Sequence, residues 1–149
     1  MARVKPMFQI LSHSVGETEA AGMLLASHLT AGDFVALYGD LGAGKTAFVR
    51  GVAALAAPGC DVTSPTYTLV NEYGEGDGRL CHFDMYRIDS EEDLESIGFE
   101  DYQDAIRIAE WCEKIPFALP ESYYRVTIEK LSPEERMIVI ERVGEGRVC

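Results

Sequence analysis

Lysine is scarce in this sequence, and the shortage limits what the protein is expected to bind. The 149 residues include only Lys5, Lys45, Lys114 and Lys130, and acidic residues outnumber basic ones by 25 to 13, a formal net charge of −12. A surface this acidic repels phosphate backbones and anionic lipid headgroups. We therefore expect no membrane binding, and contact with nucleic acid only locally or through a partner.

Closely spaced cysteines and long apolar runs are also missing. Cys60, Cys81, Cys112 and Cys149 include no Cys-x-x-Cys pair, and the three histidines do not cluster with them. This spacing predicts no zinc site, and it fits reduced thiols in a cytoplasmic protein. No segment reaches the roughly 18 consecutive apolar residues of a transmembrane helix.

The length and composition predict a single domain. A chain of 149 residues falls within the range of about 100–200 residues per domain, and 47% hydrophobic with 26% charged residues is ordinary for a globular protein. We expect one domain over residues 1–149, with a short, flexible tail from about residue 143.

Strand and helix patterns alternate along the chain. Apolar or β-branched runs predict strands at 8–11, 33–38, 66–73, 79–86, 106–111, 124–130 and 137–142. A capping box from Ser14 to Glu17 opens a helix that we expect to include His28 and Leu29, and further helices are expected at about 45–57 and after the cap Ser90. The pattern predicts a three-layer α/β domain of the P-loop NTPase type, with a mostly parallel sheet and antiparallel hairpin additions.

A glycine-rich loop is the most specific motif. The residues Gly39, Asp40, Leu41, Gly42, Ala43, Gly44, Lys45 and Thr46 match G-x-x-x-x-G-K-[ST] in full, between a predicted buried strand and a predicted helix. Such a loop points backbone N–H groups at nucleotide phosphates, with the Lys on the β- and γ-phosphates and the Thr hydroxyl on Mg²⁺. ATP or ADP is favoured over guanine nucleotides because no Asn-Lys-x-Asp segment is present.

Two acids follow predicted strands and are candidate metal or catalytic groups. Asp84 ends Leu-Cys-His-Phe-Asp and Glu110 ends Ile-Arg-Ile-Ala-Glu. Either could hold the magnesium shell while the other orients the attacking water, and the residues alone do not rank them. Ser64 and Thr66 lie in a hydroxyl-rich segment that either senses the γ-phosphate or simply begins a strand. His82 is expected to be a packing or hydrogen-bonding residue.

Several segments together resemble the TsaE family, also called YjeE. They are GDLGAGKT, SPTYTLVNEY, HFDMYR, the IGFEDY stretch, IAEW and a late Leu-Pro, and they occur in order over most of the chain. The resemblance implies the ATPase component of bacterial tRNA threonylcarbamoyladenosine synthesis, which acts with the proteins TsaD and TsaB and contacts tRNA only through that complex.

The resemblance also implies roles for individual residues. Lys45 and Thr46 look like the phosphate lysine and the magnesium ligand, Asp84 like the Walker B acid, and Glu110 like the second magnesium-site acid. Trp111 and Arg136 are similar to family residues near the nucleotide, and Ser64 to Thr68 looks like the switch loop. Ala47 departs from the family, which usually has a second Thr there, and we expect weaker nucleotide binding or slower turnover as a result.

Two other functions fit the same loop. A small-molecule kinase would need an acceptor pocket and usually an arginine-rich lid, whereas the segment from 88 to 104 is acidic. A nucleotide-gated binding module without significant hydrolysis would not need both Asp84 and Glu110. We expect a magnesium-dependent ATPase, weak alone, with Lys45, Asp84 and Glu110 as its catalytic residues.

Overall fold

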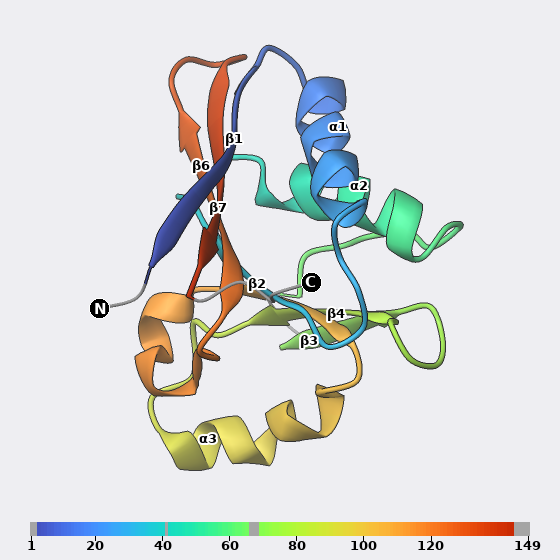
Figure 1. Ribbon diagram of the computed structural model, residues 1–149, viewed down its shortest axis with the longest axis vertical. Helices are drawn as coiled ribbons and strands as arrows, with labels where there is room; N and C mark the ends of the chain where they lie inside the picture. Colours follow the sequence, from blue (N-terminus) through green and yellow to red (C-terminus); the bar gives the residue numbers. More distant parts are fainter. Residues whose placement is uncertain (1–2, 41, 66–68, 145–149) are drawn as a thin grey trace.

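A seven-stranded mixed sheet organises the molecule (Figure 1). The computed structural model describes residues 3–40, 42–65 and 69–144. The strand order is β1-β7-β6-β2-β5-β4-β3. The strands are β1 (Val4–Ser12), β2 (Phe34–Tyr38), β3 (Val70–Tyr73), β4 (Leu80–Asp84), β5 (Ile106–Glu110), β6 (Tyr123–Lys130) and β7 (Arg136–Val143).

The sheet is parallel at its centre and antiparallel toward both edges. β2 is parallel to β5 and β6, and β4 is parallel to β5. β7 is antiparallel to β6 and β1, and β3 is antiparallel to β4. The α/β class and the parallel centre confirm the prediction, and β6 belongs to the parallel centre as well as to the late hairpin.

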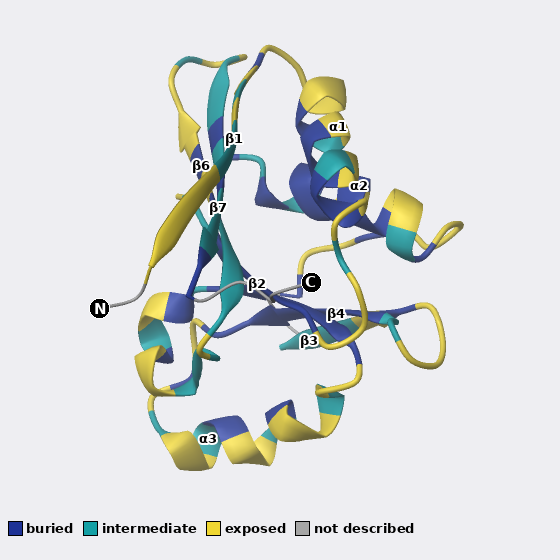
Figure 2. Cartoon of the chain, in the orientation of Figure 1, coloured by how far each residue is buried: buried dark blue, intermediate teal, exposed yellow. Residues whose placement is uncertain are grey.

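Helices cover both faces of the sheet (Figures 1 and 2). α1 (Val15–Ala26) and α2 (Lys45–Ala56) lie on one face. The other face carries α3 (Glu91–Ser96) and the 3₁₀ turns η1 (Phe99–Tyr102), η2 (Cys112–Lys114) and η3 (Pro116–Ala118). Because β2 is buried on both faces, its sequence is apolar without alternation, as in other central parallel strands.

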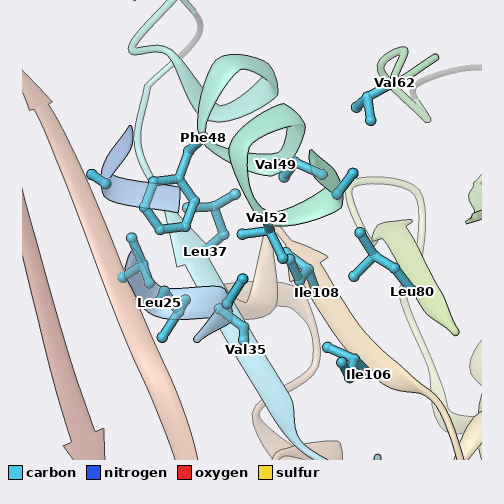
Figure 3. Close-up of a cluster of buried hydrophobic side chains, with 14 of the residues drawn as sticks. Leu25, Val35, Leu37, Phe48, Val49, Val52, Val62, Leu80, Ile106 and Ile108 are labelled. Carbon is cyan, nitrogen blue, oxygen red and sulfur yellow. The ribbon is translucent and has the colours of Figure 1, made fainter. Parts of the chain in front are cut away.

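The core under α1 and α2 is formed by branched and aromatic side chains (Figure 3). Phe48, Val49 and Val52 of α2 and Leu25 of α1 pack onto the sheet residues Val35, Leu37, Leu80, Ile106 and Ile108. All of these residues are at most 5% exposed. This packing fixes the start of α2 above the carboxyl ends of the central strands.

Two glycines let α1 and α2 approach closely. A Cβ on Gly51 would lie 1.9 Å from the carbonyl oxygen of Glu19, and one on Gly22 would lie 2.1 Å from that of Phe48. No side chain fits at such distances, so the helix contact requires glycine at both positions.

The predicted helix starts are confirmed, and one predicted end is wrong. Ser14 Oγ accepts from the N–H of Glu17, whose carboxylate accepts from the N–H of His13, and Ser90 caps α3. α1 ends at Ala26, however, so His28 and Leu29 lie in the turn that follows. Helical spacing of apolar residues continued past the point where the backbone turned toward β2.

Several strand ends also differ from the sequence prediction. β1 is longer than expected, and β3 begins at Val70, while residues 66–68 lie outside the described part of the chain. β5 stops at Glu110, because Trp111 adopts a left-handed φ of 61°. Val143, where a tail was expected, is paired with Val4 and Tyr123, and residues 145–149 are not described. Within the described ranges, no helix is long and apolar enough to cross a membrane.

Candidate functional site

The glycine loop lies where its sequence predicts, between β2 and α2. Gly42 and Gly44 have φ values of 79° and 105°, a left-handed region in which side chains are strained. The N–H of Ala43 donates to the carbonyl of Asp40 at 2.9 Å, and the N–H of Phe48 donates to Gly44 at 3.0 Å, which begins α2. Leu41 is outside the described residues.

Gly39 brings the start of this loop close to β6. A Cβ at Gly39 would lie 2.9 Å from the carbonyl oxygen of Ile128, so only glycine fits without a shift. The loop is therefore seated on the carboxyl end of the parallel strand pair β2 and β6.

Arg136 holds the opposite side of the loop. Its Nε donates to the carbonyl of Ala43 at 2.9 Å and its Nη2 to that of Gly42 at 3.3 Å. Its Nη1 donates to the Ser132 carbonyl at 2.9 Å. The guanidinium thus links the β6–β7 turn to the glycine loop through main-chain oxygens, and its expected approach to a nucleotide stays a prediction.

The two candidate acids end neighbouring parallel strands. Asp84 of β4 is in direct register with Glu110 of β5, and both residues are 7% exposed. Because strand side chains alternate between faces, both acids share the face of the buried residues Leu80, Ile106 and Ile108, which α2 covers. Asp84 Oδ1 accepts from the N–H of Tyr86 at 2.9 Å. The structure therefore brings both acids to the edge of the sheet where α2 begins.

Lys45 meets Glu110 in a buried ion pair. Lys45 Nζ lies 3.4 Å from Glu110 Oε1, with side-chain exposures of 10% and 9%. Although burial raises the pKa of Glu110, the hydrogen bond from His82 and the Lys45 ammonium outweigh it, and the pKa is lowered overall. Glu110 is thus held ionised next to the glycine loop.

His82 completes this cluster, and the sequence reasoning did not place it in the site. Its ring is fully buried, and its Nε2 lies 2.6 Å from Glu110 Oε2. The signal was strand alternation, because His82 is two residues before Asp84 and so shares its face. The expectation of a packing or hydrogen-bonding residue is confirmed.

Trp111 forms the outer wall of the cluster. The Lys45 ammonium lies 5.2 Å from the centre of the indole, within the range of a cation–π contact. Tyr86, which is 60% exposed, packs edge-on against the indole at 5.0 Å. The indole thus covers one side of the Lys45 ammonium, and Tyr86 packs on the indole.

The proposed switch segment is described only in part. Thr66 lies outside the described residues, and Ser64 is exposed. Where the chain is described again, Leu69 has a φ of 69° and its carbonyl accepts from the N–H of Asp84 at 2.9 Å. The residue that follows the segment, Leu69, is therefore bonded to the backbone of the acid at the end of β4.

A cleft opens beside the glycine loop. It has a volume of about 430 Å³. Its walls come from the start of α1, the start of α2 and the β6–β7 turn, and include Thr18, Gly44, Ala47, Pro133 and Arg136. Ala47, the departure from the family pattern, thus faces the cleft.

Thr46, Asp84 and Glu110 offer the hard oxygen donors that Mg²⁺ prefers. In the part of the chain that the structure describes, no group of three or more His, Cys, Asp or Glu side chains could hold a metal by itself. A magnesium ion here would therefore take further oxygens from a hydroxyl, water or a phosphate, as is usual for this ion.

A glycine loop lies between a buried parallel strand and a helix, and its lysine pairs with the acid at the end of the adjacent strand. This arrangement fits an α/β protein of the P-loop type. The family model for threonylcarbamoyl adenosine biosynthesis protein TsaE matches residues 12–138. The chain belongs to this TsaE family.

Individual relatives agree with this assignment. The tRNA threonylcarbamoyladenosine biosynthesis protein TsaE of Bacillus subtilis is 36% identical over 86% of this chain and 81% of its own length. The protein of the same name from Haemophilus influenzae is 39% identical over 85% of this chain and 82% of its own. The crystal structure of Bacillus subtilis YdiB superposes with a TM-score of 0.73 at 30% identity, covering 97% of this chain and 88% of that one.

Proposed function

We propose that this protein binds ATP with Mg²⁺ at residues 39–46 and hydrolyses it slowly, in support of threonylcarbamoyl modification of a tRNA adenosine together with TsaD and TsaB. The observation that carries the proposal is the buried ion pair between Glu110 and Lys45, the lysine of the glycine loop. A buried lysine and a carboxylate held ionised are the groups that phosphate binding and hydrolysis need at this place.

The pairing also suggests how ATP would engage the site. A phosphate near the loop competes with the Glu110 carboxylate for the Lys45 ammonium, since both are anions. Turning Lys45 toward the phosphate frees Oε1 of Glu110 to face a water molecule or the magnesium shell. A bound Mg²⁺ would supply positive charge that stabilises the phosphate oxygens.

Hydrolysis then needs little covalent chemistry from the protein. The water oxygen forms a bond to the γ-phosphorus, the bond from that phosphorus to the β,γ-bridging oxygen breaks, and ADP leaves with the electron pair. The proton lost by the water passes to bulk solvent by way of a nearby carboxylate. Asp84 and Glu110 are the candidate carboxylates for this proton relay, and both would also position the water and the magnesium ion.

The role in tRNA modification is supported by the family and by the names of its relatives. The net charge of −12 supports an indirect role, because an acidic surface does not attract tRNA by itself. We therefore assign the contact with tRNA to the partner proteins.

The first experiment is phosphate release from ATP and Mg²⁺, with and without the TsaD–TsaB pair, with Lys45→Ala as the blank. Stimulation by the pair that is absent in the variant supports the proposal. The single tryptophan, Trp111, lies 5.2 Å from Lys45 Nζ and reports nucleotide binding independently by its fluorescence. ATP binding without stimulated hydrolysis would reject the coupled ATPase and favour a test of phosphate transfer to small acceptors.

A further inference from the structure

The Glu110 carboxylate is held at both of its oxygens by different groups. Lys45 Nζ lies 3.4 Å from Oε1, and His82 Nε2 lies 2.6 Å from Oε2. The lysine is at the start of a helix and faces the loop, whereas the histidine is fixed in the middle of β4. The two contacts therefore differ in what a nucleotide can do to them.

The surroundings of His82 determine which ring nitrogen carries the proton. An ionised carboxylate only accepts hydrogen bonds, so Nε2 donates. Nδ1 is buried and has no hydrogen-bond partner in the described part of the chain. The hydrogen bond to Glu110 therefore comes from the Nε2–H group of His82.

We infer that His82 is a positioning residue that fixes the Glu110 carboxylate for hydrolysis after Lys45 has turned toward the phosphate. The inference rests on the proposed function. Lys45 can hold Glu110 only while the phosphate site is empty, and the hydrogen bond from the buried imidazole persists. It keeps Oε2 bound and leaves Oε1 aimed at the water or the magnesium shell.

This role predicts a particular split between binding and turnover. The loop and Lys45 supply the contacts to the phosphates, so losing His82 leaves the affinity for magnesium-free ATP close to that of the wild type. Removing a residue that orients a metal ligand or a catalytic group typically lowers activity or metal affinity by roughly 10- to 100-fold. Without the hydrogen bond from His82, we therefore expect kcat to fall and the Mg²⁺ concentration that binding requires to rise.

Two amide variants test the inference with little change in polarity. In His82→Gln the amide nitrogen reaches about as far as Nε2, whereas in His82→Asn it reaches only about as far as Nδ1. The measurements are stimulated phosphate release with the TsaD–TsaB pair, ATP affinity with and without Mg²⁺ from Trp111 fluorescence, and the melting temperature.

The expected result is that His82→Gln keeps most of the wild-type kcat while His82→Asn loses roughly 10- to 100-fold, with similar affinities for magnesium-free ATP. The concentration of Mg²⁺ needed for half-maximal ATP binding rises in His82→Asn. Equal kcat values in the two variants, whether high or low, would overturn the inference. If the wild type itself releases no more phosphate than Lys45→Ala, the proposed function fails and the inference is rejected with it.

Discussion

Lys45 and Glu110 form an ion pair that is almost closed to water, with Nζ and Oε1 3.4 Å apart. The pair joins the first residue of α2 to the last residue of β5, two elements far apart in the sequence. It occupies the lysine that the proposed nucleotide phosphate would need, so we expect nucleotide binding to compete with the pair.

Replacing Glu110 separates these two effects. In Glu110→Gln the carboxylate charge is gone and Lys45 is released, so we expect ATP affinity equal to or tighter than that of the wild type. Loss of a positioned carboxylate typically lowers the rate by roughly 10²- to 10⁴-fold. Phosphate release and Trp111 fluorescence measure the two quantities. Glu113→Gln, an exposed acid three residues further on, is the control and should change neither. Weaker ATP binding in Glu110→Gln would contradict competition for the lysine.

Acidification should lower the stability of the folded protein by protonating Glu110. Burial raises the pKa of Glu110, but the hydrogen bond from His82 and the charge of Lys45 lower it below its ordinary value of 4.5. A lowered pKa in the folded state means that ionised Glu110 stabilises the fold above pH 4.5, and that this contribution disappears as the pH falls through the lowered value. The difference in melting temperature between wild type and Glu110→Gln should therefore shrink on acidification below 4.5. A constant difference across that range would show that the charge of Glu110 does not contribute.

Arg136 should matter for nucleotide affinity without touching the phosphates. Its guanidinium bonds the carbonyls of Ala43 and Gly42, and hydrogen bonds of this charged type contribute about 1.5–3 kcal/mol. We expect Arg136→Ala to weaken ATP binding by roughly tenfold, at the lower end of that range. Arg136→Lys should not restore binding, because an ammonium cannot bridge the same set of carbonyls. Arg142→Ala, on the same strand but stacked on Tyr124, is the control.

The contact between α1 and α2 should tolerate no side chain at Gly51. A Cβ there would lie 1.9 Å from the Glu19 carbonyl oxygen, so Gly51→Ala must push the helices apart. Overpacking costs about 1–3 kcal/mol or more, which would appear as a lower melting temperature. Gly16→Ala in the first turn of α1 is the matched control, since the nearest atom would be 3.8 Å away. It should be neutral or stabilise by up to about 1 kcal/mol, and equal effects of the two changes would argue against the close contact.

A substitution at Ala47 should strengthen ATP binding. Ala47 lines the cleft beside Gly44, so Ala47→Thr adds a hydroxyl where a nucleotide is proposed to bind. One additional hydrogen bond is worth about 0.5–1.5 kcal/mol, which corresponds to roughly two- to twelvefold tighter ATP binding. Titration of Trp111 fluorescence measures the affinity. Unchanged affinity and rate would remove Ala47 as an explanation for weak activity.

Much of the architecture could be predicted because local signals agreed with the tertiary fold. The unbroken apolar run of β2, the helix caps Ser14 and Ser90 and the glycine loop are each decided within a few residues. Element ends were less predictable. The left-handed conformation of Trp111 and the end of α1 at Ala26 depend on where the chain must go next, which composition does not encode.

In the candidate site, the residue types could be predicted from the sequence, whereas their contacts could not. Strand-end position was enough to select Asp84 and Glu110, and the loop motif selected Lys45. That His82 and Lys45 reach different oxygens of one carboxylate depends on the parallel register of β4 and β5, with Asp84 opposite Glu110. The hydrogen bonds from Arg136 to main-chain carbonyls likewise depend on the position of the β6–β7 turn against the glycine loop.

The pairing of β1 with β7 also constrains when this sheet can close during translation. Val4 pairs with Val143, and Ser12 with Arg136, so β1 leaves the ribosome long before the strand that it pairs with. Long-range pairing of this kind delays sheet closure and leaves the early edge exposed in the meantime. The glycine loop depends on the same late segment, because Arg136 is the first residue of β7. A nascent chain should therefore form the contact between Arg136 and the glycine loop only after β7 has been synthesised.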